Sequence, residues 1–284
     1  MASVRDIRRH IRSVSNIKKI TKTMEMVAAA RMHKATAALL ASRPYAQLAW
    51  HMLLGLSSKA ERELHPLLRS RSVEKTMIVL ITSDRGLCGS FNLHLIRQAL
   101  KLVTDKDRFQ FIAIGRKGRE FLTRQGYQVI AEFTGLAAPV PYLAMGPIAQ
   151  IVFKEYMESK VDEVYIVYSN FISNFVQKPS YLKLAPLINE QAEPDVRAPF
   201  VYEPSAEAIM ATLIPRIIEY QIYAMMLETQ ASEFAARMVA MKNATENAEK
   251  LIDDLVLSCN KVRQESITKE LTELSTSTAV IEEV

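Results

Sequence analysis

Residues 210–262 read MATLIPRIIEYQIYAMMLETQASEFAARMVAMKNATENAEKLIDDLVLSCNKV. Apolar residues recur along this stretch at alternating spacings of three and four, and Thr245 is the one polar member of the series. The series is Met210, Leu213, Ile217, Tyr220, Ala224, Leu227, Ala231, Phe234, Met238, Met241, Thr245, Ala248, Ile252, Leu255, Cys259 and Val262. These spacings keep one stripe on one side of a helix with about 3.5 residues per turn, as in a coiled coil. Globular helices average about 11 to 12 residues, so the pattern predicts a long paired helix, kinked near Pro215.

The beginning of the chain supplies the candidate partner helix. Its apolar residues are Val4, Ile7, Ile11, Val14, Ile17, Ile20, Met24 and Val27. The steps from Val14 to Ile20 are three and three, a skip in the heptad that should overwind the pair locally. We expect this helix to continue to about Ser57, with a kink at Pro44. The predicted seam between the two helices includes Met24, Val27, Phe234, Met238, Ile252 and Leu255.

Charge is distributed unevenly between the two ends of the chain, although the net charge is only +5. Residues 1–34 are strongly basic, whereas residues 246–284 carry more acidic than basic side chains. Opposite charges at the two ends suit two helices that lie side by side. A basic helix could instead bind nucleic acid, so that interpretation stays open at this stage.

The middle of the chain predicts an α/β domain. Short apolar runs rich in β-branched residues occupy residues 76–82, 109–114, 127–133 and 164–168, and a last strand is expected at 181–185. Helical stretches separate them at residues 93–103, 116–125 and 148–159. Continuous apolar strands that alternate with helices indicate a mainly parallel, Rossmann-like sheet with helices on its faces.

These elements predict an α/β fold in which a long antiparallel coiled coil of N- and C-terminal helices carries an inserted Rossmann-like α/β domain. The predicted boundaries are an N-terminal helix at 1–60, the α/β domain at 75–186 and a C-terminal helix at 205–284, with linkers at 61–74 and 187–204. Both helices leave the same domain, so they must run antiparallel if they pair. Placing Ser57 near Ile209 brings Val4 beside Val262.

The apolar stripe continues beyond Val262, one residue out of step. Its later members are Ile267, Leu271, Leu274 and Ile281. At 1.5 Å per residue the last helix would be about 110 Å long and the first about 80 Å, so the last outruns the first. An apolar tip without an internal partner requires an external one.

Composition limits the class of protein. A chain of 284 residues with 49% hydrophobic content can bury a core and form one or two domains. The sequence contains no run of about 18 apolar residues, so no membrane span is predicted. The N-terminus lacks the apolar core of a secretory signal. Cys88 and Cys259 form neither a close pair nor a metal spacing, which fits a reducing compartment. The scattered histidines predict no metal site.

The candidate chemical motif is TSDRGLCGSFN at residues 82–92, directly after the first predicted strand. A glycine-rich turn between strand and helix can bind phosphate through backbone N–H groups. No Gly-Lys-Ser/Thr follows, however, and Gly86 with Gly89 does not match a dinucleotide fingerprint. We therefore favour a structural turn over catalysis or nucleotide binding. Cys88 lacks a local histidine that would activate it, so an inert buried thiol is expected.

Four stretches together resemble the γ subunit family of F-type ATP synthases. They are IRRHIRSVSNIKKITKTMEMVAAARM (7–32), TSDRGLCGSFN (82–92), EFAARMVAMKNATENAEKLI (233–252) and NKVRQESITKELTE (260–273). The resemblance covers essentially the whole chain. No added regulatory cysteine pair of the chloroplast members appears, and no cleavable leader is recognised, so a bacterial member is expected.

The resemblance implies a rotor shaft without catalytic groups or cofactors of its own. The coiled coil would stand inside a ring of α and β subunits, and the α/β domain would sit beside ε on the c-subunit ring, at the cytoplasmic face of the bacterial plasma membrane. Rotor–stator contacts would involve Arg8, Arg9, Met24, Arg263, Gln264 and Thr268. The tip bearing would consist of Ile267, Leu271 and Leu274.

Two alternatives from other classes have distinct tests. An α/β enzyme with a helical oligomerisation arm would itself bind nucleotide, so saturable binding of ATP by the isolated chain would favour it. A coiled-coil nucleic-acid protein would use the basic first helix. That helix has no aromatic residues among its basic ones, and salt-dependent retention on DNA beyond that of a charge-matched control would be needed to support this class.

Overall fold

The computed structural model describes residues 3–55, 66–69, 71–187 and 206–282. Side chains are described within these ranges except at 46–55, 206–209 and 273–282. Residues 61–65 and 70 of the predicted linker 61–74, and residues 188–204 of the predicted linker 187–204, lie outside the described residues.

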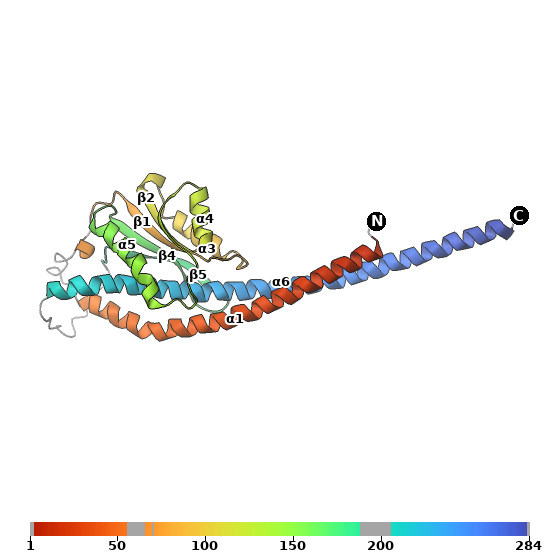
Figure 1. Ribbon diagram of the computed structural model, residues 1–284, viewed down its shortest axis with the longest axis horizontal. Coiled ribbons are helices and arrows are strands. Elements are labelled where there is room, and N and C mark those ends of the chain that lie inside the picture. Colours follow the sequence, from red (N-terminus) through yellow and green to blue (C-terminus); the bar gives the residue numbers. More distant parts are fainter. Residues whose placement is uncertain (1–2, 56–65, 70, 188–205, 283–284) are drawn as a thin grey trace. The chain divides into compact units, whose positions relative to one another are not determined.

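Two long helices begin and end the described chain (Figure 1). Helix α1 spans Val4–Gly55 and helix α6 spans Ala206–Glu282, and they continue through Pro44 and Pro215 respectively. The chain divides into two compact units. The first contains the described residues up to Val27 and those from Met238 onward, and the second runs from Ala28 to Arg237. Each long helix therefore contributes to both units.

The first unit is an antiparallel helical pair. The Lys18 ammonium donates to Glu249 Oε1 at 2.7 Å, and the Thr245 hydroxyl donates to the Thr21 hydroxyl at 2.8 Å. Both contacts follow the predicted register that places Val4 beside Val262, since the residue number rises on one helix as it falls on the other.

A five-stranded sheet forms the centre of the second unit, with the order β3-β2-β1-β4-β5. The strands are β1 (Thr76–Ile81), β2 (Phe109–Ile114), β3 (Gln128–Phe133), β4 (Glu163–Phe171) and β5 (Gln177–Ala185). The first four run parallel to one another, and β5 pairs antiparallel with β4. All six residues of β1 are buried, and all but Thr76 are apolar, which is typical of a strand covered on both faces.

Among the described residues, three α-helices and two short 3-10 helices connect the strands. They are α3 (Phe91–Leu100), α4 (Arg116–Arg124), α5 (Gly146–Met157), η2 (Lys106–Arg108) and η3 (Tyr142–Met145). A further 3-10 helix, η1 (Pro66–Leu68), precedes β1. From β1 the chain passes through α3 to β2 and through α4 to β3, so these strands are added on one side of β1. It then crosses through α5 to β4, on the other side of β1. Because such crossovers are right-handed, α5 lies on the opposite face from α3 and α4.

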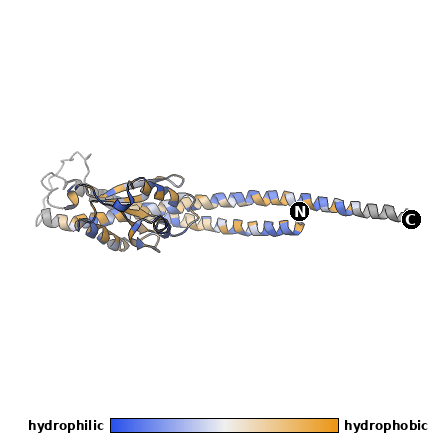
Figure 2. Ribbon diagram, turned by 90° about the horizontal axis from the view of Figure 1, so that it is seen from above, coloured by the Kyte–Doolittle hydropathy of each residue, from blue (hydrophilic) through white to orange (hydrophobic). Residues whose placement is uncertain are grey.

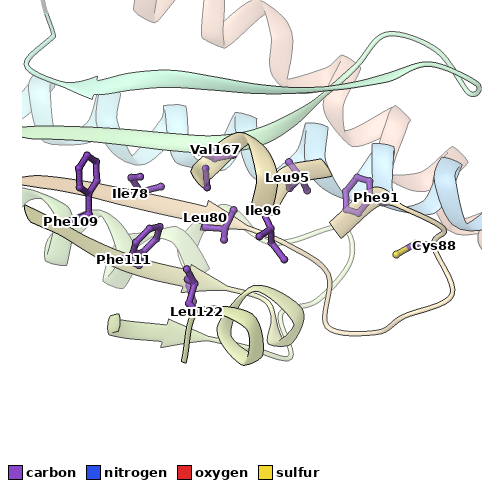
Figure 3. Close-up of a cluster of buried hydrophobic side chains, with 12 residues drawn as sticks. Ile78, Leu80, Cys88, Phe91, Leu95, Ile96, Phe109, Phe111, Leu122 and Val167 are labelled. Carbon is purple, nitrogen blue, oxygen red and sulfur yellow. The ribbon is translucent and has the colours of Figure 1, made fainter. Parts of the chain in front are cut away.

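Side chains from α3 and α4 pack on one face of the sheet (Figure 3). Leu95 of α3 and Leu122 of α4 are buried with Leu80 of β1 and Phe111 of β2. Four fully buried side chains of this size stabilise the domain by roughly 1.5–3 kcal/mol each relative to an exposed state. This core fixes the loops at the carboxyl ends of the strands.

Helix α6 is buried more extensively in the second unit than a single seam requires. Its Thr229 hydroxyl accepts a hydrogen bond from the Ser169 backbone N–H at 3.2 Å, and its Ser232 hydroxyl donates to the Ser169 carbonyl at 3.2 Å. Gln230 bonds the backbone of Ala137 and Val140. Helix α6 therefore packs on the α/β domain as well as on α1, whose Ser42 carbonyl accepts a bond from the Tyr220 hydroxyl.

The contact between α6 and Ser169 occurs where a doubly wound sheet ordinarily binds a ligand. The order of the strands reverses between β1 and β4, and ligands bind beyond the carboxyl ends of the strands at such a point. Ser169 lies beyond the last residue of β4 that pairs with β1, Val167. The side chains of Thr229 and Ser232 thus form hydrogen bonds with the backbone of Ser169 at this edge.

Candidate functional surfaces

The seam of the helical pair contains a polar layer that the sequence analysis did not predict. The less exposed positions of α1 in this unit follow spacings of three and four through Val14, Lys18, Thr21 and Glu25. The heptad therefore continues without the predicted skip. The Lys18–Glu249 ion pair and the Thr21–Thr245 hydrogen bond give these polar side chains partners in the seam.

The continuous heptad turns several apolar residues of α1 outward. Ile17 is 50% exposed, Ile20 59% and Val27 49%. The assignment of Val27 to the seam is therefore wrong, and so is the inclusion of Ile17 and Ile20 in the buried stripe. The physical reason is that Lys18 and Thr21 find partners on α6, so the helix need not rotate to bury the isoleucines.

The other predicted seam residues are less exposed. Phe234 is buried, with the guanidinium carbon of Arg31 5.9 Å from its ring centroid. Met24, Met238, Ile252 and Leu255 are half-buried. Ile7, Val14, Ala248 and Cys259 are buried more completely. Figure 2 shows the alternation of hydrophobic and hydrophilic residues along both helices.

The outer surface of α1 combines basic and apolar side chains. Arg8 and Arg9 are exposed, and the Arg9 guanidinium lies 3.9 Å from the Asp6 carboxylate. We call the surface formed by Arg8, Arg9, Ile17, Ile20 and Val27 the outer α1 surface. An exposed apolar stripe on a helix that already has a partner on its other side indicates a further protein contact.

Helix α6 is exposed all round from Arg263 to Thr272. Each described side chain from Arg263 to Thr272 is exposed, including Gln264, Ile267 at 49% and Leu271 at 62%. The Thr268 hydroxyl donates to the Gln264 carbonyl at 2.9 Å within the helix. The side chain of Leu274 lies outside the described residues. The structure therefore brings Arg263, Gln264 and Thr268 together on neighbouring turns of one exposed helical segment.

The loop at residues 82–92 is held by hydrogen bonds rather than arranged for catalysis. Asn92 accepts from the Ser83 backbone N–H at 2.9 Å, and its side-chain amide donates to Cys88 Sγ at 3.3 Å. Burial raises the pKa of the Cys88 thiol, which keeps it protonated. The Asp84 carboxylate accepts from the N–H groups of Arg116 at 3.0 Å and Gly135 at 2.8 Å. These contacts tie together the three loops at the carboxyl edge.

Gly115 has a conformational role in this arrangement. Its φ is +93°, and a Cβ at this position would overlap the carbonyl oxygen of Thr82. Glycine therefore permits the β2–α4 turn to lie against the end of β1.

Among the described residues no group of His, Cys, Asp and Glu is arranged to hold a metal ion, and no helix has the length and hydropathy of a membrane span.

A family model described as ATP synthase matches residues 3–280 of the chain. The ATP synthase γ chain of Desulfitobacterium hafniense is 41% identical over 283 residues, covering 99% of this chain and 100% of the relative. That of Desulforamulus reducens is 40% identical over 285 residues, with coverage of 99% and 100%. This chain belongs to the ATP synthase γ chain family.

Two solved structures resemble the fold of this γ family member. A chain in the central stalk and c ring of the Tetrahymena thermophila mitochondrial ATP synthase aligns with a TM-score of 0.64 and 25% identity, over 79% of this chain and 99% of that one. A chain in the Euglena gracilis mitochondrial ATP synthase structure with OSCP, F1 and c ring gives a TM-score of 0.73 at 19% identity, over 98% and 94%. The γ family fold thus extends over nearly the whole chain.

Two features of this γ family member were missed by sequence reasoning. The polar layer was missed because apolar spacing alone was used, although Lys18 and Thr21 continue the heptad from Val14. The second is a group of arginines near the carboxyl edge of the sheet, at positions 31, 85, 116 and 237. These residues are far apart in the sequence, and only the fold of the second unit brings them together.

Proposed function

We propose that this chain is the central rotor shaft of an F-type ATP synthase. It would couple ion-driven rotation of the membrane c ring to conformational change, and so to ATP synthesis or hydrolysis, at the catalytic β subunits. Its partners would be the α and β ring, the ε subunit and the c ring, at the cytoplasmic face of the bacterial plasma membrane. Residues 1–60 and 205–284 would form the shaft, and residues 75–186 the domain beside the c ring.

Family membership together with the antiparallel helical pair carries this proposal. The same chain offers no catalytic group in the loop at 82–92, where a nucleotide enzyme of this sheet type would need one. Helix α6 also contacts Ser169 at the edge where such a sheet would bind a nucleotide. A coupling role requires neither catalytic residues nor a cofactor on this chain.

Coupling follows from surface asymmetry of the shaft. A ring subunit that meets the outer α1 surface encounters guanidinium and isoleucine side chains, whereas the opposing helix carries carboxylates such as Asp253 and Asp254, which are exposed. A contact that favours one conformer of a catalytic subunit over another shifts its population by that difference in binding free energy. Rotation would present different surfaces to each subunit in turn.

Directional contacts are proposed for two regions of the shaft. Arg8, Arg9 and Met24 would contact the ring from α1, and Arg263, Gln264 and Thr268 from α6. Guanidinium groups bind carboxylates through paired hydrogen bonds of defined geometry. The exposure of Arg263 and Gln264 leaves both side chains available for such bonds. These contacts would form and break at defined rotation angles.

The tip beyond them is proposed to act as a bearing. Ile267, Leu271 and Leu274 would contact an apolar collar formed by other subunits. Apolar contacts are non-directional, so a rotating helix can exchange them without losing fixed hydrogen bonds. The exposure of Ile267 and Leu271 supports this assignment.

The experiment is reconstitution of the full chain with α, β and ε partners from a bacterial relative. We expect stoichiometric assembly and restoration of ATP-driven proton pumping in membranes stripped of their own γ chain. ATP hydrolysis by the isolated full chain is the control, and none is expected. Failure to assemble, or hydrolysis by the isolated chain alone, would favour the enzyme class over the rotor.

A further inference from the structure

The second unit contains a cavity of about 400 Å³ lined by four arginines. Arg85 comes from the loop after β1, Arg116 from the first turn of α4, Arg31 from α1 and Arg237 from α6. Two carboxylates, Asp84 and Glu233, also line it. We call this site the arginine cavity. Its volume is within the range of about 300–1,000 Å³ that is usual for small-molecule sites.

Both carboxylates already have partners. Asp84 accepts the N–H groups of Arg116 and Gly135, at 3.0 and 2.8 Å. Glu233 Oε1 lies 2.7 Å from the Arg237 guanidinium, and the side chains of the two are only 15% and 11% exposed. Asp84 also occupies the N-terminus of α4, so that helix end is not available to a ligand.

The guanidinium groups of Arg31, Arg85 and Arg116 remain available to bind an anion. Among the described residues, no carboxylate lies within 4.0 Å of the guanidinium of Arg31, Arg85 or Arg116. Arg237 additionally donates to the Arg85 carbonyl at 3.2 Å, which fixes the backbone of the β1–α3 loop beside the cavity. The cavity is thus held in shape by the Arg237–Glu233 pair and keeps an excess of positive charge.

We propose that the arginine cavity binds an anion of the phosphate class, either free phosphate or polyphosphate, or the phosphate tail of a nucleotide. Planar guanidinium groups pair with phosphate oxygens through parallel N–H···O bonds. Arginines from three helices and one loop converge on one concave site, which suits an anion with several oxygens better than a single-atom anion such as chloride. This site is distinct from the rotor surfaces proposed above, because it needs no other subunit.

Calorimetric titration of the isolated full chain at constant ionic strength tests the proposal. The probes are inorganic phosphate, tripolyphosphate, ATP and a short polyglutamate peptide. We expect saturable binding of tripolyphosphate, binding of ATP that is no tighter than that of tripolyphosphate, and weaker binding of phosphate. Equal affinity for ATP and tripolyphosphate, with no hydrolysis of ATP by the isolated chain, would distinguish this anion site from the nucleotide site of an α/β enzyme. Arg85→Gln with Arg116→Gln should weaken tripolyphosphate binding by about tenfold or more. Arg97→Gln with Arg124→Gln, two exposed arginines on α3 and α4, removes the same charge and should leave binding unchanged.

Protection of the unaltered chain gives a second readout that does not depend on a variant folding. Tripolyphosphate should slow modification of Arg85 and Arg116 by phenylglyoxal, measured by mass spectrometry, and leave Arg97 and Arg124 unaffected. Absence of saturable binding, or equal loss in both double variants, would overturn the proposal. Tighter binding of polyglutamate would assign the cavity to an acidic protein segment instead, and much tighter binding of ATP than of tripolyphosphate would show recognition of the base.

Discussion

The hydroxyl of Thr245 donates a hydrogen bond to the hydroxyl of Thr21 across the helical pair, with 2.8 Å between the two oxygens. Thr21 in turn donates to the Lys18 carbonyl at 3.0 Å, one turn earlier on its own helix. Lys18 pairs with Glu249, one turn further along α6. The polar layer therefore favours one register of an otherwise apolar seam, because a slip of the helices would break both the Thr21–Thr245 and the Lys18–Glu249 contacts.

Replacement of Thr245 by Val should destabilise the helical pair by about 1 kcal/mol, since Thr21 loses its donor in a partly buried seam. The double change Thr21→Val with Thr245→Val should cost less than the sum of the single changes, because two apolar side chains then meet. Denaturant unfolding of all four chains of the cycle, followed by circular dichroism, measures the coupling. Strictly additive effects would show that the hydroxyls do not interact.

The Lys18–Glu249 pair has a pH signature. The hydrogen bond from Lys18, followed by its positive charge, lowers the pKa of Glu249 below its ordinary value. A lowered folded-state pKa stabilises the pair above the unfolded-state pKa, and this stabilisation is lost as pH falls through the folded-state pKa. Lys18→Met should raise the Glu249 pKa towards its ordinary value, as measured by NMR titration of side-chain carboxyl carbons.

Leu255→Asp and Leu257→Asp place the same charge on opposite sides of α6. Leu255 is half-buried, whereas Leu257 is 69% exposed. We expect about 2–3 kcal/mol of destabilisation and loss of assembled complex for Leu255→Asp, because a carboxylate enters the seam. Leu257→Asp should be close to neutral. Normal assembly and coupling of the Leu255 variant would show that this position does not pack against α1.

Gly115→Ala and Gly86→Ala test the glycine turn. The first forces a Cβ onto the Thr82 carbonyl at a φ of +93°, whereas a Cβ at Gly86 meets nothing within 4 Å. We expect Gly115→Ala to cost about 3 kcal/mol or more of unfolding free energy and Gly86→Ala to change it little. Thermal unfolding of the two full chains provides the comparison. Equal melting temperatures would show that the backbone of the turn is not constrained.

Sequence reasoning predicted the elements because each rests on a local pattern. Strand Phe109–Ile114 was predicted to the residue, since its apolar run has turn residues on both sides. Helix α6 was recognised from its heptad, and the antiparallel register followed from where the helices leave the α/β domain. The elements depend on residues that lie close together in the chain, and the register depends on the order of those elements.

Sequence reasoning failed where the burial of a side chain depends on contacts with distant parts of the chain. Val27 fits an apolar stripe as well as any seam residue, yet Lys18 and Thr21 occupy the seam because Glu249 and Thr245 offer them partners. The second burial of α6, through Thr229 and Ser232, depends on Ser169 more than fifty residues earlier. No local pattern contains such contacts.

Two regions of the shaft are predicted to have different roles. Replacing Arg263 and Gln264 by Ala should reduce ATP-driven proton pumping relative to hydrolysis, with a loss of about 1.5–3 kcal/mol for each charge-assisted bond removed. Truncation after Leu274 should instead lower assembly or thermal stability more than turnover per assembled complex. Both are measured in membranes that hold equal amounts of complex. Unchanged pumping in the first, with total loss of function in the second, would reverse these roles.

Rotation of this chain inside its complex tests the rotor proposal most directly. The α and β ring would be fixed to a surface, and a bead attached through an exposed residue of α3, such as Arg97→Cys, would report the angle of the chain during ATP hydrolysis. The proposal predicts continuous turning of the bead in one direction, which stops when ATP is removed. Sustained hydrolysis by complexes whose bead only fluctuates about a fixed angle would contradict it.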